Sequence, residues 1–290
     1  MTGRGTSLHR PNGTLARDGW ACVVDPETAG WAYSGLRVLD LAAGGSISFD
    51  TGPDEMLLLP LSGSATVTCE DTSFELTGRG SVFSRVSDFS YAPRDATVTV
   101  TSRDGGAFAI PSARCTRRLE PRYGPAEDVP VELRGAGQAS RQVNNFCSPA
   151  AFECDKLIAV EVLTPGGNWS SYPPHKHDET REDEAELEEI YYFETEGLAY
   201  QRVYGTPARP VDVLAEVSTG DVILIPHGWH GPSMAPPGYH LYYLNVMAGP
   251  APGRAWRVCF DPAHDWVAGT WAGQDIDPRL PLTSAAAPEG

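Results

Sequence analysis

The sequence predicts an all-β fold built from two similar barrel-like units in tandem. Its 290 residues include 30 glycines and 25 prolines, which favour many short elements joined by turns over long helices. Short apolar runs separated by turn signals recur at intervals of roughly 8 to 12 residues, a spacing typical of sandwiches, jelly rolls and small barrels. Between these runs the sequence lacks the helical periods that alternate with strands in a βαβ fold.

The apolar runs fall into two series that are separated by one long connection. The first series predicts strands at residues 36–41, 56–63, 64–69, 73–76, 96–102 and 106–111. The second series predicts strands at residues 156–165, 186–194, 198–205, 211–226, 240–249 and 255–260. Residues 112–150 are rich in Arg, Pro, Gly and Asn and are expected to link the two units. We therefore expect an N-terminal domain at residues 1–145, including this connection, and a C-terminal domain at residues 146–290.

Charge and composition argue against several classes of function. The chain has 22 Lys and Arg against 38 Asp and Glu, and the net charge of −16 repels phosphate backbones and anionic membrane surfaces. No apolar run approaches the roughly 18 to 20 residues that span a bilayer. Neither nucleic acid nor a membrane is therefore an expected partner. The six cysteines show no C-x-x-C spacing and the N-terminus lacks a signal-peptide segment, so we expect free thiols and a cytoplasmic protein.

Histidine is the informative residue type, because four of the seven histidines fall in two short segments of the second unit. On a strand, the two imidazoles of an H-x-H pair lie on one face and can bind one metal ion. The intervening Lys176 points to the other face, where a surface position is expected. The four clustered histidines are His175, His177, His227 and His230.

A carboxylate ligand is expected from the acidic run at residues 178–189, most of which we otherwise interpret as a solvated loop. In the strand expected at 188–194, Glu189 and Tyr191 share one face. The opposite face carries charge at both ends, through Glu188 and Glu194, so it is expected to lie outside the barrel. Glu189 therefore points inward.

A further ligand is expected from the segment after Gly220, where a turn and a buried strand precede two histidines. Either His227 or His230 faces the barrel, and a bend at Gly228 decides which one. Three imidazoles and one carboxylate favour a site for one divalent metal ion, and this mixed donor set accepts Zn, Mn, Fe, Co or Ni.

The two histidine segments resemble the motifs H-x-H…E and G-x5-P-x-G…H of the cupin superfamily. Here the motifs are His175-Lys176-His177…Glu189 and Gly220…Pro226-His227-Gly228-Trp229-His230. Longer strings, which together cover almost the whole chain, resemble the bacterial 5-deoxy-glucuronate isomerases of inositol catabolism. These strings are GWAYSGLRVLDL (30–41), RGAGQASRQVNN (134–145), GNWSSYPPHKHD (167–178), EEIYYFE (188–194), GWHGP (228–232) and GYHLYYLNVMAGP (238–250).

The resemblance implies two tandem cupin domains, each a jelly-roll β-barrel, with a metal-free first cupin and the metal in the second. The family is related to the isomerase of 4-deoxy-5-hexosulose-uronate in pectin breakdown. The implied reaction is aldose–ketose isomerisation of 5-deoxy-D-glucuronate to 5-dehydro-2-deoxy-D-gluconate through a metal-bound enediolate. The residues that fall on the family's ligand positions are His175, His177, Glu189 and His230.

The same reaction suggests roles for further residues. Proton transfer is expected from a nearby water, from Tyr191 or another barrel tyrosine, or from Glu189 if it leaves the metal. A uronate carboxylate is expected to pair with a buried arginine, for which Arg141 is the first choice and Arg134 the second. The other residues expected to bind substrate are Tyr172, Tyr243 and Asn245.

Two other functions fit the same residues. The first is an Fe(II) cupin dioxygenase that acts on a small organic acid. The second is a sugar-binding bicupin without turnover, in which the metal is structural. The sheet edges exposed in cupins often pair, which favours a homodimer in each case.

Overall fold

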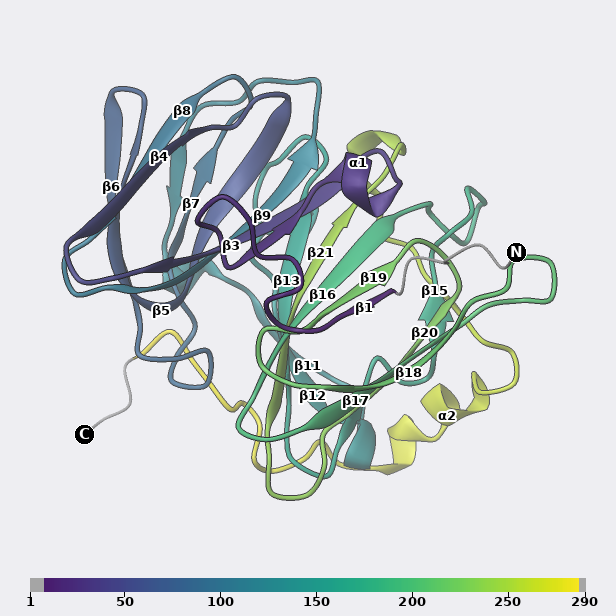
Figure 1. Ribbon diagram of the computed structural model, residues 1–290. Helices are drawn as coiled ribbons and strands as arrows, with labels where there is room; N and C mark the ends of the chain where they lie inside the picture. Colours follow the sequence, from purple (N-terminus) through teal and green to yellow (C-terminus); the bar gives the residue numbers. More distant parts are fainter. Residues whose placement is uncertain (1–7, 287–290) are drawn as a thin grey trace.

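Antiparallel β-sheets make up most of the regular secondary structure (Figure 1). The computed structural model describes residues 8–286, and the prediction of an all-β fold is confirmed there. Across these residues, no helix has the length and apolar character needed to cross a membrane. The helical segments are α1 (Pro26–Ala29), η1 (Ala126–Asp128), η2 (Gly137–Ala139), η3 (Pro252–Arg254), α2 (Trp266–Gly269) and η4 (Trp271–Gly273).

The strands are distributed over three sheets. The nine-stranded sheet contains β2 (Cys22–Val24), β3 (Ser34–Leu41), β4 (Gly45–Asp50), β5 (Asp54–Cys69), β6 (Thr72–Arg79), β7 (Phe89–Ala92), β8 (Thr97–Ser102), β9 (Gly106–Arg114) and β10 (Arg122–Gly124). The seven-stranded sheet contains β1 (His9–Arg10), β11 (Val131–Arg134), β12 (Arg141–Asn144), β13 (Ile158–Thr164), β16 (Glu188–Thr195), β19 (Val222–Ile225) and β21 (Leu241–Ala248). The six-stranded sheet contains β14 (Trp169–Ser170), β15 (His175–Lys176), β17 (Ala199–Tyr204), β18 (Asp212–Val217), β20 (Trp229–Met234) and β22 (Cys259–Phe260).

The nine-stranded sheet curls around its own core and forms the N-terminal unit. Its longest strand, β5, has 16 residues, where the sequence predicts two strands at 56–63 and 64–69. The chain bends here without leaving the sheet, because Gly63 adopts a φ of 81° and register shifts flank it on the pairings with β9 and β6. One continuous strand therefore pairs with β7 and β9 at one end and with β6 and β8 at the other.

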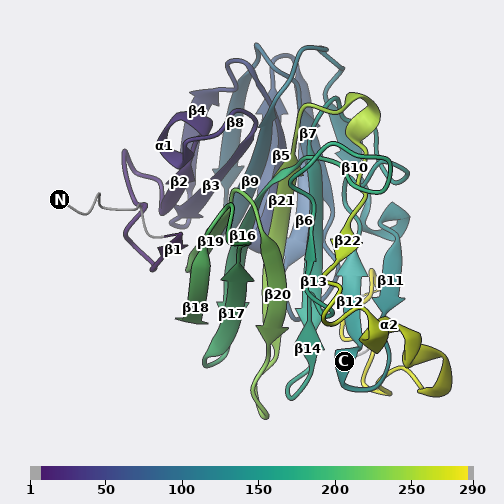
Figure 2. The ribbon, with the colours of Figure 1, turned by 90° about the vertical axis from the view of Figure 1, so that its right-hand side faces the viewer.

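The six- and seven-stranded sheets face each other and enclose the core of the C-terminal unit. Figure 2 shows β18, β17, β20 and β14 side by side in front of this unit. The run expected at 211–226 forms two strands, β18 and β19, because the turn that contains Gly220 interrupts it and sends them to different sheets. Buried side chains from both sheets, including Phe193 and Val203, fill the space between them.

The inner strands of the seven-stranded sheet are buried on both faces. Tyr191 and Phe193 of β16 pack inside the C-terminal unit, whereas Ile190 and Tyr192 pack against the N-terminal unit. This alternation follows the two-residue period of a strand. The face of residues 188–194 that was expected outside the barrel does lie outside it, but the neighbouring unit covers it. This face therefore contacts the N-terminal unit and not solvent.

Several segments cross between the two units. Near the N-terminus, β1 pairs with β19 of the C-terminal unit, with His9 opposite Ile223. Residues 112–150, expected as a connection, contain β11 and β12, which extend the seven-stranded sheet beyond β13. Near the other end of the chain, the Val86 amide donates to the Ser284 carbonyl at 2.9 Å. Both ends of the described chain are thus tied into the fold (Figure 1).

Two carboxylates, the partly buried Glu188 and the buried Glu55, add polar links between the units. Glu188 accepts hydrogen bonds from the backbone amides of residues 32–34 at 2.6 to 2.8 Å. In the other direction, Glu55 accepts from the backbone amides of residues 155–157 at 2.5 to 3.0 Å. Each carboxylate thus gives hydrogen-bond partners to three consecutive backbone amides of the other unit.

The third link is a buried ion pair between Arg79 and Glu161. Both side chains are fully buried, and their second contact, from Arg79 Nη1 to Glu161 Oε2, measures 3.1 Å. Glu161 also accepts a hydrogen bond from Tyr242 Oη at 2.9 Å and one from Asn144 Nδ2 at 3.2 Å. The pair therefore belongs to a polar network enclosed between the two units.

We expect Arg79→Met to lower the thermal unfolding midpoint by about 10 °C, because losing one partner of a buried ion pair costs about 3 to 5 kcal/mol. Differential scanning calorimetry measures this shift. The matched control is Arg103→Met, since the Arg103 side chain is 90% exposed beside Asp104, and its midpoint should hardly change. Equal midpoints for the two variants would contradict the importance of the buried pair.

Candidate active site

Three histidines come together between the two sheets of the C-terminal unit. His175 of β15 lies directly opposite His230 of β20, and His177 follows β15. The ring centroid of His230 is 4.4 Å from that of His175 and 4.7 Å from that of His177. The nitrogen atoms that can ligate a metal all lie within 4.8 Å of one another. The arrangement suits chelation of a single ion.

Glu189 reaches the histidines from the opposite sheet. Its Oε2 atom lies 3.0 Å from His177 Nε2 and 2.9 Å from His230 Nε2. Its other oxygen, Oε1, is buried without a hydrogen-bond partner, and His230 Nε2 faces Oε2 without forming an aligned hydrogen bond. Buried polar atoms without partners are uncommon, and here a cation would satisfy both. His227, the alternative in the sequence, lies outside the histidine cluster and is only partly buried.

Backbone carbonyls hold two of the imidazole rings from behind. His177 Nδ1 lies 3.2 Å from the Leu187 carbonyl, and His230 Nδ1 lies 3.2 Å from the Gly228 carbonyl. A carbonyl can only accept a hydrogen bond, so it favours the tautomer with the proton on Nδ1. The Nε2 atoms are then free to act as ligands, which is a common arrangement around metal-binding histidines.

Burial and neighbouring charges set the protonation of the cluster. Burial lowers the pKa of His175 well below its usual value, and the charges of His230 and His177 lower it further. Burial also opposes charge on His177, but the Glu189 carboxylate outweighs it and raises the pKa of that histidine. Burial raises the pKa of Glu189, but the two histidines outweigh it and lower that pKa far below its usual range. Glu189 is therefore charged, and His175 is neutral, at neutral pH.

On the opposite face of β15, Lys176 occupies a buried ion cluster. It points away from the histidines, as strand alternation predicts, but it is only 7% exposed, so the expected surface position is wrong. Lys176 Nζ lies 2.6 Å from Asp178 Oδ1 and 2.8 Å from Glu184 Oε1. The other oxygen of Asp178 accepts from the Gly228 amide at 2.8 Å. Asp178 thus connects the H-x-H segment with the turn that leads to His230.

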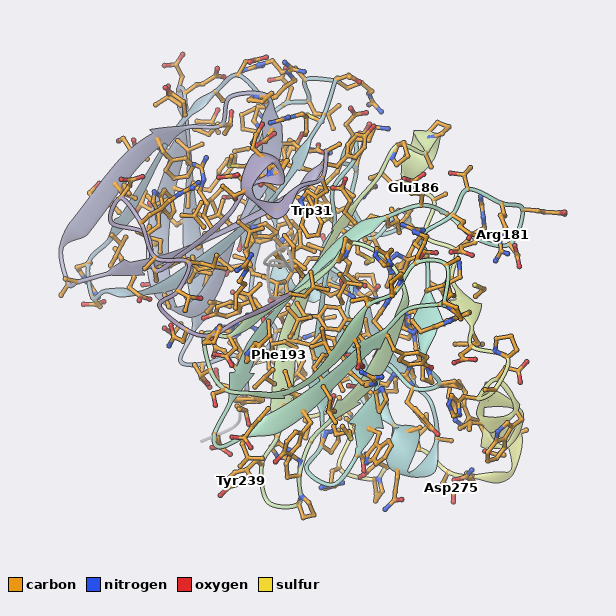
Figure 3. All side chains as sticks on the ribbon, turned by 45° about the vertical axis from the view of Figure 1, so that its right-hand side comes forward. Trp31, Arg181, Glu186, Phe193, Tyr239 and Asp275 are labelled. Carbon is orange, nitrogen blue, oxygen red and sulfur yellow. The ribbon has the colours of Figure 1, made fainter. Side chains whose placement is uncertain are left out.

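The acidic run at residues 178–189 is only in part the solvated loop that was expected. Asp183 is exposed, but Glu184 and Glu189 are fully buried. Glu184 also receives a hydrogen bond from Arg181, which lies on the loop at the outer edge of the C-terminal unit in Figure 3. The buried carboxylates of this run are therefore the two with charged or histidine partners: Glu184 contacts Lys176 and Arg181, and Glu189 contacts the histidine cluster.

A cavity adjoins the histidine cluster inside the barrel. It encloses about 340 Å³ of space, part of which is open to solvent. Five of the residues predicted for substrate binding or catalysis line it together with His175, namely Arg134, Arg141, Tyr191, Tyr243 and Asn245. The remaining lining residues are Val143, Val160, Val162, Ser171 and Trp256.

Arg141 is a buried cation in this cavity. It is 6% exposed, donates from Nη1 to the Ala139 carbonyl at 3.0 Å, and lies over the Trp271 ring at 5.6 Å. Among residues 8–286, no carboxylate forms an ion pair with it. Burial, and then the nearby charge of Arg134, lower the pKa of Arg141 to about 10, so it remains charged at neutral pH. A buried guanidinium without a carboxylate partner is suited to bind an anion.

Tyr191, Tyr243 and Asn245 form the polar side of the cavity. The two tyrosine rings stack with centroids 4.6 Å apart. Burial, followed by the charge of Glu189, raises the pKa of Tyr191 well above its usual value, so the phenol keeps its proton at neutral pH. Asn245 Oδ1 is buried without a hydrogen-bond partner. This side of the cavity therefore offers both a donor and an acceptor.

Tyr172 does not line this cavity. It lines a neighbouring cleft of about 690 Å³, part of it open to solvent, together with Trp169 and Trp271. Its carbonyl accepts from Arg141 Nη1 at 3.4 Å. Tyr172 thus contacts a cavity residue, Arg141, through its backbone carbonyl and not through its side chain.

The apolar part of the cavity was not anticipated from the sequence. Val143 follows Arg141 by two positions and so shares its strand face, a signal that could have been used. Val160 and Val162 share a face of the next strand in the same way. Trp256 carried no such signal, because it lies in the run expected as a strand at 255–260, of which only Cys259–Phe260 pairs.

Comparison with known proteins places these features in a family. The model of the KduI/IolB family matches residues 8–267. The 5-deoxy-glucuronate isomerase of Geobacillus kaustophilus (strain HTA426) is 42% identical over 265 residues, which cover 89% of this chain and 93% of that protein. The 5-deoxy-glucuronate isomerase of Bacillus subtilis (strain 168) is 39% identical over 241 residues, covering 81% and 88% of the two chains.

Solved structures agree with this relationship. An IolB-like protein from Salmonella typhimurium LT2 superposes with a TM-score of 0.84 at 35% identity, covering 90% of this chain and 99% of that one. Oxalate decarboxylase from Lactobacillus farciminis has a TM-score of 0.63 at 13% identity over 89% of this chain and 90% of the other, which supports the fold alone. The fold is that of two tandem cupin barrels, and the chain belongs to the KduI/IolB family.

Proposed function

We propose that this protein is a metal-dependent aldose–ketose isomerase that converts 5-deoxy-D-glucuronate to 5-dehydro-2-deoxy-D-gluconate. The observation that carries the proposal is one cavity that joins a histidine–carboxylate cluster to a buried arginine without an acidic partner. The first group suits the carbonyl end of a sugar acid, and the second suits its carboxylate. The relatives named 5-deoxy-glucuronate isomerase support the choice of substrate.

The metal would be held by His175, His177, His230 and Glu189. The unpartnered Glu189 Oε1 supports this assignment, and so do the convergence of His177 Nε2 and His230 Nε2 on Glu189 Oε2 and the charged state of the carboxylate. When bound, a divalent ion supplies Lewis-acid polarisation of the substrate carbonyl. The mixed nitrogen and oxygen set is compatible with Zn, Mn, Fe, Co or Ni.

The remaining residues would bind the sugar acid and hold protons. Arg141 binds the carboxylate by a charge-assisted pair. Asn245 Oδ1 accepts a hydrogen bond from a substrate hydroxyl, which gives this buried atom its missing partner. Tyr191 keeps its proton and donates it toward a substrate oxygen. Because the pKa of Glu189 is held low, we assign it to the metal and not to proton abstraction.

The proposed location of this activity is the cytoplasm. All six cysteines lie within the described residues, and none forms a disulfide. Free thiols are the usual state of cysteine in a reducing compartment.

Proton NMR of 5-deoxy-D-glucuronate incubated with the purified protein in D₂O tests the proposed reaction. We expect conversion to the ketose acid, loss of conversion after a chelator, and recovery when a divalent metal is added back. Deuterium should appear at the carbon that gains hydrogen, because proton transfer exchanges with solvent.

Three other results would contradict this proposal in different ways. No conversion by metal-loaded protein would exclude the substrate. Oxygen consumption that depends on the substrate would identify a dioxygenase. Saturable uronate binding without product would identify a binding protein.

Arg141→Met should raise KM for the uronate about 100-fold, because a charge-assisted hydrogen-bonded pair contributes about 1.5 to 3 kcal/mol. Steady-state kinetics on metal-loaded protein measure the change. The control is Arg202→Met, since Arg202 of β17 pairs with the exposed Asp212 outside the cavity and its loss should leave KM unchanged. An unchanged KM in Arg141→Met would refute carboxylate binding at this position.

Asp178→Ala should weaken divalent-metal binding about 10-fold, because groups that support ligand segments typically contribute 10- to 100-fold to metal affinity. Lys176 keeps Glu184 as a partner in this variant, so the buried cation remains paired. Competition with a chromophoric chelator measures the affinity directly. Asp183→Ala is the control, because that side chain is 70% exposed on the same loop. Equal affinities in a folded Asp178→Ala would contradict the link through Gly228.

A further inference from the structure

One wall of the cavity next to Arg141 is lined by hydrocarbon. Val143 stands two residues after Arg141 on β12, so both side chains lie on the same strand face. Val162 is paired with Val143, and Val160 follows on the same face of β13. All three valines line the cavity and are at most 6% exposed. On the β12 and β13 side, therefore, the cavity wall that follows Arg141 consists of hydrocarbon, and Arg134 is the polar side chain that lies opposite Arg141 on β11.

The register of the sheet places these valines between the two charged ends of the site. Rows of paired, inward-facing residues run across the sheet from β12 towards β16. One row contains Val143, Val162, Tyr243 and Phe193; the next contains Val160, Asn245 and Tyr191; the third contains Ile158, Met247 and Glu189. Moving from Arg141 toward Glu189, a ligand crosses the valine rows before it reaches the metal ligands. The polar atoms of these rows belong to β21 and β16.

A uronate that extends from Arg141 to the histidine cluster places each of its carbons beside a particular row of the sheet. If its carboxylate pairs with Arg141 and its carbonyl end faces the histidines, the carbon next to the carboxylate lies beside Val143 and Val162. A hydroxyl on that carbon would be buried against methyl groups without a partner. A methylene in the same place would instead gain apolar contact.

We infer that Val143, Val160 and Val162 determine specificity by selecting sugar acids that are deoxygenated at the carbon adjacent to the carboxylate. This inference rests on the proposed function and extends it to one position of the substrate. An apolar pocket rejects an added hydroxyl by about 100-fold at most, which sets the size of the discrimination. The valines disfavour the hydroxylated sugar in both the ground state and the transition state. The discrimination therefore appears in kcat/KM.

The test compares kcat/KM for 5-deoxy-D-glucuronate and D-glucuronate, which differ only by the hydroxyl at this carbon. The wild-type protein should prefer the deoxy sugar by about 100-fold. Val162→Thr and Val143→Thr keep the side-chain shape and add a hydrogen-bonding group, so each should reduce the preference at least about 10-fold. Activity on D-glucuronate should rise while activity on the deoxy sugar falls.

Val203→Thr is the matched control, because Val203 is a fully buried valine of the same core that does not line the cavity. The kcat/KM preference of Val203→Thr for the deoxy sugar should equal that of the wild type. A changed preference in the cavity variants then reflects specificity and not a loss of stability. Equal kcat/KM for the two sugars in the wild type would overturn the inference alone, as would an unchanged preference in both cavity variants that retain wild-type circular dichroism. Conversion of neither sugar by metal-loaded wild type would overturn the proposed function together with this inference.

Discussion

The burial of one sheet on both faces is the constraint on which the rest of the structure depends. Side chains alternate along β16, so Glu189 and Tyr191 face the site while Ile190 and Tyr192 face the N-terminal unit. A slip of one residue would exchange the two sets and place the carboxylate that now faces the histidines between the two units. The N-terminal unit thus supports the site by covering the back of the strand that carries Glu189.

The buried charges of the C-terminal unit differ in how they are neutralised. Lys176 is matched by carboxylates, and Glu189 is matched by histidines. Arg141 has no such partner among the described residues, although the chain carries a net charge of −16. The overall charge disfavours long-range attraction of an anion. Under the proposed function, binding of a carboxylate would therefore depend on short-range contacts inside the cavity, above all on Arg141.

Much of the fold was predictable because turn residues and strand periods are local properties. The positions of most strands, their division into two series and the inward orientation of Glu189 all follow from period-two patterns and turn signals. The continuity of β5 was not predictable, because Gly63 bends a strand or ends it depending on the neighbouring strands. The pairing of β1 with β19 likewise depends on residues about 210 positions away, as in the contact between His9 and Asp221.

For the candidate site, the sequence by itself determined the chemistry of the ligands and the face from which each approaches. The H-x-H spacing fixes the common face of His175 and His177, because a strand repeats every two residues. Only the tertiary structure decided between His227 and His230, because the choice depends on how the turn at Gly228 is held by Asp178. It also decided that Lys176 is buried and that the valine wall adjoins Arg141. These properties arise when distant segments pack together, and no local pattern records which segment covers a given face.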